Sequence, residues 1–168
     1  MITNFKLTPA TLDDIPRIQE IAYKTWATAY KNVISSEQIT YMLEMMYNTQ
    51  TLSKLIQQPD FLFYLINDGA GIAALELHYE NTISKLHKIY ILPEHQGKGL
   101  GKKTIQSLTN ISQNAGDKSI ILNVNKKNAA THFYEKCGFI RWRSEVIDIG
   151  GDYVMDDYVY RKDFSALR

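Results

Sequence analysis

Hydrophobic residues in the first third of the chain recur every three or four positions, which is the spacing of amphipathic helices. One helix is predicted to follow Thr11, whose spacing to Asp14 fits an N-terminal cap, and a second to follow Ser35, capped in the same way with Gln38. A third and shorter helix is expected to end before Pro59. The three apolar stripes are Ile15, Ile18, Ala22 and Trp26; Ile39, Met42, Leu43 and Met46; and Leu52, Leu55 and Ile56.

From residue 61 the pattern changes to short runs of apolar and β-branched residues, which predict strands. With a first strand at 5–8, strands are expected at 61–66, 72–79, 86–92, 119–124, 139–147 and 153–162. Helical spacing returns at 105–115, and again from Asn128, the expected N-terminal cap, to Lys136. Gly116 and Gly138 are natural stops for these two helices.

These elements predict a single α/β domain over residues 1–168. The sheet should be mixed and mostly antiparallel, because most predicted strands are joined by turns, and helices should cover both of its faces. We find no linker, repeat or low-complexity segment in the sequence.

Composition narrows the classes of function. The chain has 168 residues and a formal net charge of +1, which suits one domain with a substantial core and gives no pull toward nucleic acid or an anionic membrane. No segment approaches the roughly 20 apolar residues of a membrane span, and no signal peptide is visible. The single cysteine cannot form an internal disulfide. We therefore expect a cytoplasmic protein with neither nucleic acid nor membrane as a partner.

The stretch from Leu86 to Gly101 is the most informative part of the sequence. A predicted strand ends at Pro93, and three glycines then occupy alternate positions, 97, 99 and 101, directly before a helical pattern. Glycines let the backbone turn several N–H groups toward one point, and the start of a helix adds further unpaired N–H groups and a positive dipole end. The stretch therefore predicts a cradle for phosphate.

Two common phosphate motifs do not fit this stretch. A P-loop requires G-x-x-x-x-G-K-[ST], but Gly101 and Lys102 are followed by Lys103, and Gln96 stands where the first glycine belongs. A dinucleotide site requires G-x-G-x-x-G, and the glycines here alternate instead. Without a second motif, the stretch is equally compatible with a flexible connection between a strand and a helix.

A second motif lies downstream. Gln96, Gly99 and Gly101 fit Q/R-x-x-G-x-G/A, which resembles the signature of the GNAT superfamily of N-acetyltransferases. Residues 128–139 resemble the family's N-x-x-A-x-x-F-Y-x-x-x-G-F segment, with alanines at positions 129 and 130. Two matches in the order found in the family are far more specific than either alone.

This resemblance implies a GNAT-like fold with acetyl-CoA as cosubstrate. The strands near 86–92 and 119–124 would be parallel and splay apart, and the pantetheine arm would pair with exposed backbone in the gap. By this analogy, backbone groups of Ile89, Tyr90 and Ile91 hold the arm.

The same resemblance places the pyrophosphate at the glycine-rich stretch. Its expected N–H donors are those of Gln96, Gly97, Lys98, Gly99, Leu100 and Gly101. Asn128 is expected to add a side-chain contact to the arm. Lys98, Lys102 and Lys103 are candidates for neutralising phosphate charge, although a solvated helix face would have the same residues.

Acetylation of an amine requires two proton transfers. An alkylammonium with a pKa of about 10.4 is neutral about once in 2,500 molecules at pH 7, so a base must accept its proton, and the departing thiolate needs a donor. Tyr134 stands where the family places its acid tyrosine. His87 stands near the position of a glutamate in many relatives, and a neutral imidazole can accept a proton at pH 7. Glu76 or a chain of water molecules remains an alternative base.

Other reactive residues give no site. His78, His95 and His132 have no partner at a metal-ligand spacing, so we predict no metal. Cys137 follows a predicted helix, and we expect it to pack rather than to act as a nucleophile.

The sequence thus predicts an acetyl-CoA-dependent N-acetyltransferase in which a primary amine attacks the thioester directly within a ternary complex. A small cationic amine is the expected acceptor, since carboxylates gather in the segments that wall the acceptor site in the family: Glu76, Glu80, Asp148, Asp152, Asp156 and Asp157. The alternatives are a protein N-terminal or lysine acetyltransferase and a non-catalytic acyl-CoA sensor. The sequence leaves open whether the protein forms a homodimer.

Overall fold

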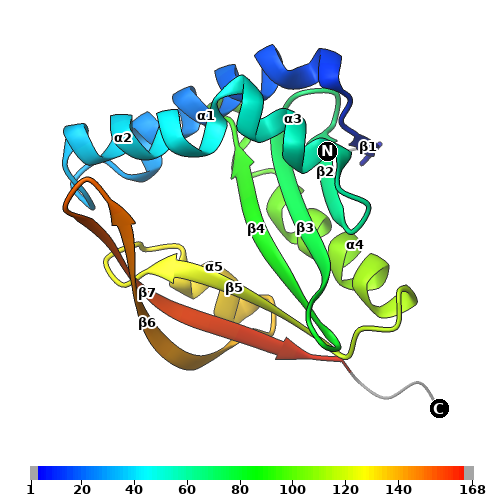
Figure 1. Ribbon diagram of the computed structural model, residues 1–168. Coiled ribbons are helices and arrows are strands. Elements are labelled where there is room, and N and C mark those ends of the chain that lie inside the picture. The colour runs from blue at the N-terminus through cyan, green and yellow to red at the C-terminus, as the bar shows by residue number, and fades with distance from the viewer. Residues whose placement is uncertain (1–3, 165–168) are drawn as a thin grey trace.

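The computed structural model describes residues 4–164, so the ends of the predicted domain, 1–3 and 165–168, lie outside the described residues. Figure 1 shows the arrangement of the elements. The strands are β1 (Leu7–Pro9), β2 (Phe61–Ile66), β3 (Gly71–Glu80), β4 (Ile83–Ile91), β5 (Ser119–Asn125), β6 (Ile140–Gly150) and β7 (Tyr153–Asp163). The helices are α1 (Ile15–Ala29), α2 (Ser36–Tyr47), α3 (Thr49–Gln57), α4 (Leu100–Asn114) and α5 (Thr131–Lys136), with short 3-10 turns η1 (Leu12–Asp14) and η2 (Pro93–His95).

The strands form one mixed sheet in the order β1-β2-β3-β4-β5-β7-β6. All neighbours are antiparallel except β4 and β5, which are parallel and pair only from Ile83 opposite Ser119 to Leu86 opposite Leu122. Beyond these pairs the two strands diverge, as Figure 1 shows in green and yellow. The predicted splay between the two parallel strands is therefore present.

Helices cover both faces of the sheet, which confirms the predicted α/β architecture. Helices α1, α2 and α3 pack on one face around a core that includes Ile18, Trp26 and Leu52, all at most 1% exposed. Helix α4 packs on the other face through Ile105 and Leu108, and α5 lies on the same side. No helix among residues 4–164 is long and apolar enough to cross a membrane.

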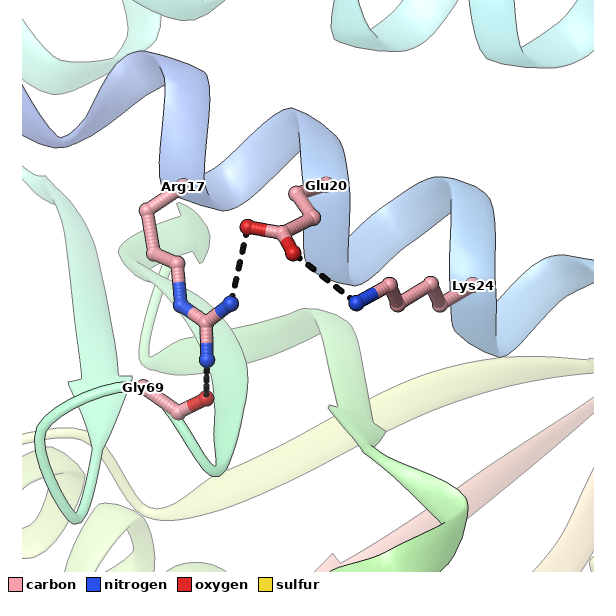
Figure 2. Close-up of polar contacts among 4 residues, drawn as sticks. All are labelled: Arg17, Glu20, Lys24 and Gly69. Atoms are coloured by element: carbon pink, nitrogen blue, oxygen red, sulfur yellow. Dashed lines mark hydrogen bonds and ion pairs between the residues drawn. The ribbon is translucent and has the colours of Figure 1, made fainter.

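The first helix is tied to the tip of the β2–β3 hairpin by one side chain (Figure 2). Arg17 donates from Nη2 to the carbonyl oxygen of Gly69 and from Nη1 to Glu20, each at 2.8 Å. Glu20 also accepts from Lys24, and the hydrogen bonds from Lys24 and Arg17 lower the pKa of its carboxyl. The ion pairs are exposed and contribute little, so we assign Arg17 the task of orienting α1 on the sheet.

Several predicted boundaries differ from the structure. The first strand begins at Leu7 rather than at residue 5, and helix α5 begins at Thr131 rather than at Asn128. The predicted cap at Asn128 is wrong because its Oδ1 accepts from the backbone N–H of Ala130, which closes an Asx turn before the helix. Ser35 does cap α2 by accepting from the N–H of Gln38, at 3.1 Å.

Candidate active site

A cleft of about 570 Å³ opens where β4 and β5 diverge. Its walls come from β4, β5, the glycine-rich loop, α1, and the start of α5. The residues lining this cleft are Thr25, Ala29, Tyr30, Leu86, His87, Lys88, Ile89, Tyr90, Ile91, His95, Gln96, Gly97, Gly99, Leu100, Gly101, Lys102, Leu122, Asn123, Val124, Asn128, Ala130, Phe133 and Tyr134. The residues predicted to bind acetyl-CoA or to transfer protons all line this cleft, except Lys98, Lys103 and the alternative base Glu76.

The glycine-rich loop ends the cleft with a run of free backbone donors. Gly97 and Gly99 have φ angles of +75° and +80°, which residues with a side chain rarely adopt. The first backbone bond of α4 joins the N–H of Lys103 to the carbonyl of Gly99. Within residues 4–164, none of the N–H groups of 97–102 donates to another residue. Together with the helix dipole they form a site for an anion.

Gln96 is held by hydrogen bonds within the loop. Its N–H already donates to the carbonyl of Pro93, and its side chain donates to the carbonyl of Ile91 at 2.9 Å. The Gln96 N–H is therefore occupied within the protein and its side chain closes the loop, so we leave it out of the proposed pyrophosphate donors. The Nζ of Lys98 donates to the carbonyl oxygen of Glu94, whereas Lys102 lines the cleft.

Gly101 is required by packing rather than by its backbone angle. A Cβ at this position would lie 2.9 Å from Cζ of Phe133, a residue of α5 that lines the same cleft. The third glycine of the motif thus lets α4 and α5 approach each other beside the cleft.

A β-bulge places His87 where the two strands separate. Leu86 pairs with Leu75 and Lys88 with Ala74, so His87 has no partner on β3. Its Nε2 lies 2.7 Å from Glu76 Oε2. Burial lowers the pKa of the imidazole, as do the charges of Lys85 and Lys88, while the nearby carboxylate acts in the opposite direction. A neutral ring that donates from Nε2–H to Glu76 leaves Nδ1 as the free acceptor.

Tyr134 lies on α5 with its ring between those of Phe133 and Phe139, at 5.3 and 6.1 Å between centroids. Among the described residues its hydroxyl has no hydrogen-bond partner. Burial, reinforced by Tyr30 and Cys137, raises the pKa of this phenol, so the group keeps its proton at neutral pH.

A small side cavity of about 30 Å³ adjoins the cleft and shares Tyr30 and Asn123 with it. Its remaining lining residues are Ile34, Gln38, Met42, Asn125, Met155 and Asp157. Asp157 is 1% exposed, accepts from Asn123 at 3.3 Å, and has its pKa raised by burial and by Glu145. A buried carboxylate therefore faces the cavity that continues the cleft.

The other predicted carboxylates lie in different surroundings. Asp156 forms an exposed ion pair with Lys126 at 2.8 Å, and Asp148 accepts from the N–H of Gly150 in the hairpin turn. Asp152 also lies in that turn, with a φ of +62°, and Glu76 is bound to His87. Of these carboxylates, Asp157 lines the side cavity, and the others line neither that cavity nor the cleft.

Comparison with known proteins identifies the family. Residues 30–155 match the acetyltransferase (GNAT) domain family. The chain belongs to the GNAT acetyltransferases. GNAT enzymes take the acetyl group from acetyl-CoA, so the predicted enzyme class and cosubstrate are confirmed with the family.

Individual GNAT relatives differ in their acceptors. The spermidine N(1)-acetyltransferase of Thermoplasma acidophilum is 26% identical over 152 residues, covering 87% of this chain and 92% of the relative. The N-alpha-acetyltransferase 30 of Schizosaccharomyces pombe is 30% identical over 93 residues, covering 52% and 62%. The crystal structure of the PaiA N-acetyltransferase of T. acidophilum with coenzyme A has a TM-score of 0.80 at 23% identity, covering 96% of this chain and 100% of that one.

The GNAT cleft also contains a lysine that the sequence reasoning missed. Lys88 is 6% exposed, and its Nζ lies 4.5 Å from the centre of the Tyr47 ring. No carboxylate of residues 4–164 forms an ion pair with it. Burial lowers its pKa to about 8. The alternation of β4 could have revealed its position, because Lys88 lies two residues from Tyr90, which packs in the core under α1.

This lysine should make the stability of the protein depend on pH. Unfolded Lys88 titrates near 10.5 and folded Lys88 near 8, so between these values the unfolded chain binds more protons and the free energy of unfolding rises with pH. The total rise is about 3 kcal/mol. Urea unfolding should show about 2 kcal/mol of this rise between pH 7.5 and 9.5, and Lys88→Met should be more stable at pH 7.5 and lack it. An identical slope in both proteins contradicts the assignment.

Proposed function

We propose that this GNAT enzyme acetylates a primary amine of a small cationic acceptor, by direct attack on the thioester in a ternary complex. The observation that carries the proposal is that one cleft joins the free amides of the glycine-rich loop, Tyr134 and His87, and continues into the cavity at Asp157. The amides of 97–102 would bind the pyrophosphate, and the unpaired edge of β4 after Leu86 would pair with the pantetheine arm.

His87 and Tyr134 would supply the two proton transfers. The Nδ1 lone pair of His87 would accept a proton from the amine, directly or through water, while Glu76 fixes the ring through Nε2. Tyr134 would donate its hydroxyl proton toward the departing sulfur. Because burial lowers the pKa of His87, this residue would remain an acceptor well below pH 6.5.

Asp157 would select the acceptor by charge. An ammonium on the acceptor, away from the reacting amine, would meet the buried carboxylate in the side cavity, where attraction is screened less than at the surface. Similarity to a spermidine N(1)-acetyltransferase supports an acceptor with more than one amine. The side cavity of about 30 Å³ would hold one small group, such as the terminal ammonium of an aliphatic diamine or polyamine.

Asp157→Asn tests this role. We expect the KM for a polyamine to rise about ten- to a hundredfold, the range for a lost charged hydrogen bond, and the KM for acetyl-CoA to stay unchanged. Asp156→Asn is the matched control, since its carboxylate pairs with Lys126 at the surface and should leave both constants near those of the wild type.

An acceptor screen decides between this proposal and its alternatives. Polyamines, aminoglycosides, amino acids and peptides should be compared by release of the CoA thiol. A peptide as best acceptor would replace the proposal by a protein N-terminal or lysine acetyltransferase. Tight acetyl-CoA binding with no turnover on any amine would indicate a sensor.

A further inference from the structure

Strand β6 forms a long and uncovered edge of the sheet. It has 11 residues and, within residues 4–164, pairs only with β7. Large apolar side chains are exposed along it, with Ile140 at 65%, Val146 at 64% and Trp142 at 40%. Soluble proteins normally keep edge strands short or covered, because unpaired backbone groups bind further strands. An edge of this kind is a candidate surface for another chain.

The sequence of β6 is complementary to itself. Arg143 and Glu145 lie two positions apart on a regular stretch that begins after the bulge at Trp142. Residues with this spacing point to the same face of the sheet. If a second β6 ran antiparallel beside the first, the arginine of each copy could oppose the glutamate of the other.

We propose that two copies of this chain pair through β6 to form a continuous sheet, with the two-fold axis at Ser144. A two-fold axis that relates two antiparallel strands is perpendicular to the sheet. Residues that oppose each other across the axis must point to the same face of the sheet. The axis therefore lies level with one residue, which opposes its own copy. Arg143 or Glu145 on the axis would oppose like charges. An axis at Val146 would place Arg143 opposite the partner's Ile149, and Glu145 opposite the partner's Ile147.

The axis at Ser144 is the position that pairs opposite charges. It places Arg143 opposite the partner's Glu145 twice. One carboxylate oxygen of Glu145, Oε2, already accepts a hydrogen bond from Asn123, which lines the cleft. The second oxygen would bind the partner's Arg143. The partner's Arg143 would therefore neutralise the carboxylate beside Asp157, which leaves Asp157 as the anion for the proposed cationic acceptor.

Disulfide trapping tests the position of the axis. Ser144→Cys in a Cys137→Ala background should oxidise rapidly to a disulfide-linked dimer, because opposed Cα atoms of antiparallel strands lie about 4.5–5.5 Å apart, within disulfide range. Asp148→Cys in the same background is the matched control. It lies on the same exposed strand, but its copies would be roughly 27 Å apart, so it should not cross-link. Equal cross-linking of the two variants would overturn the proposed axis.

A charge exchange tests the interface without cross-linking. Light scattering of the wild type should give twice the chain mass of 19.3 kDa. Arg143→Glu and Glu145→Arg should each weaken the dimer about tenfold or more, since each opposes like charges, and the double variant should restore it. Restoration also shows that the exchanged residues are compatible with folding. A monomeric wild type, or a double variant as weak as the single ones, would overturn the proposal, whatever the outcome of the acceptor assays.

Discussion

Tyr134→Phe should lower kcat about ten- to a thousandfold, with little change in the affinity for acetyl-CoA. The variant keeps the ring between Phe133 and Phe139 and removes only the hydroxyl, which has no partner among the described residues. Its loss should therefore leave the fold intact and deprive the leaving thiolate of its proton donor. We expect the change in kcat rather than in the affinity for acetyl-CoA, because the proton donor acts while the carbon–sulfur bond breaks.

Steady-state kinetics at saturating amine measures this effect. Tyr64→Phe is a suitable control, since Tyr64 packs on the same face of the sheet but does not line the cleft. A kcat within twofold of the wild type would reduce Tyr134 to a packing residue and would leave the thiolate to be protonated by solvent.

Gly99→Val should reduce the affinity for acetyl-CoA by about a hundredfold or more. Gly99 has a φ of +80° at the start of α4, and a β-branched residue strongly disfavours that angle. Relaxation of the backbone would turn the amides of 97–102 away from their common point. Several charged hydrogen bonds to pyrophosphate would be lost together, each worth about 1.5–3 kcal/mol.

The matched control is Gly116→Val. Gly116 also has a positive φ, +95°, and a Cβ there also meets nothing within 4 Å, but it lies at the opposite end of α4. Both variants carry similar backbone strain, so calorimetric titration with acetyl-CoA isolates the effect on binding. Equal affinities of the two variants would show that the loop does not bind the pyrophosphate.

The parts of the fold that follow local rules could be predicted from sequence. The helical stripes, the glycine-rich loop and the positions of most strands along the chain depend on residues close together in the sequence. Asn128 was misplaced by a local competition, because its side chain could cap a helix or close an Asx turn, and only the latter occurs. The resemblance to a family carried the prediction of Tyr134, since a helix tyrosine has no catalytic signature of its own.

The side chains that distinguish this site depend on contacts between distant segments. His87 leaves the β3–β4 ladder at a bulge, and nothing near it in the sequence signals a bulge. Asp156 and Asp157 are neighbours with the same chemistry, yet one is exposed beside Lys126 and the other is buried at a cavity. Strand alternation could separate the two, but only the packing of β7 against α1 and α2 shows which side is enclosed.

The short pairing between β4 and β5 has a consequence for how the protein responds to its ligand. Only the pairs from Ile83–Ser119 to Leu86–Leu122 join the two halves of the sheet by a ladder. An extended arm bound between them would act as an additional strand and close the seam. Binding should then slow amide hydrogen exchange across the whole sheet, including β2 and β6 far from the contact, and raise the thermal midpoint with ligand concentration. The bound cosubstrate would therefore stabilise the fold as well as supply the acetyl group.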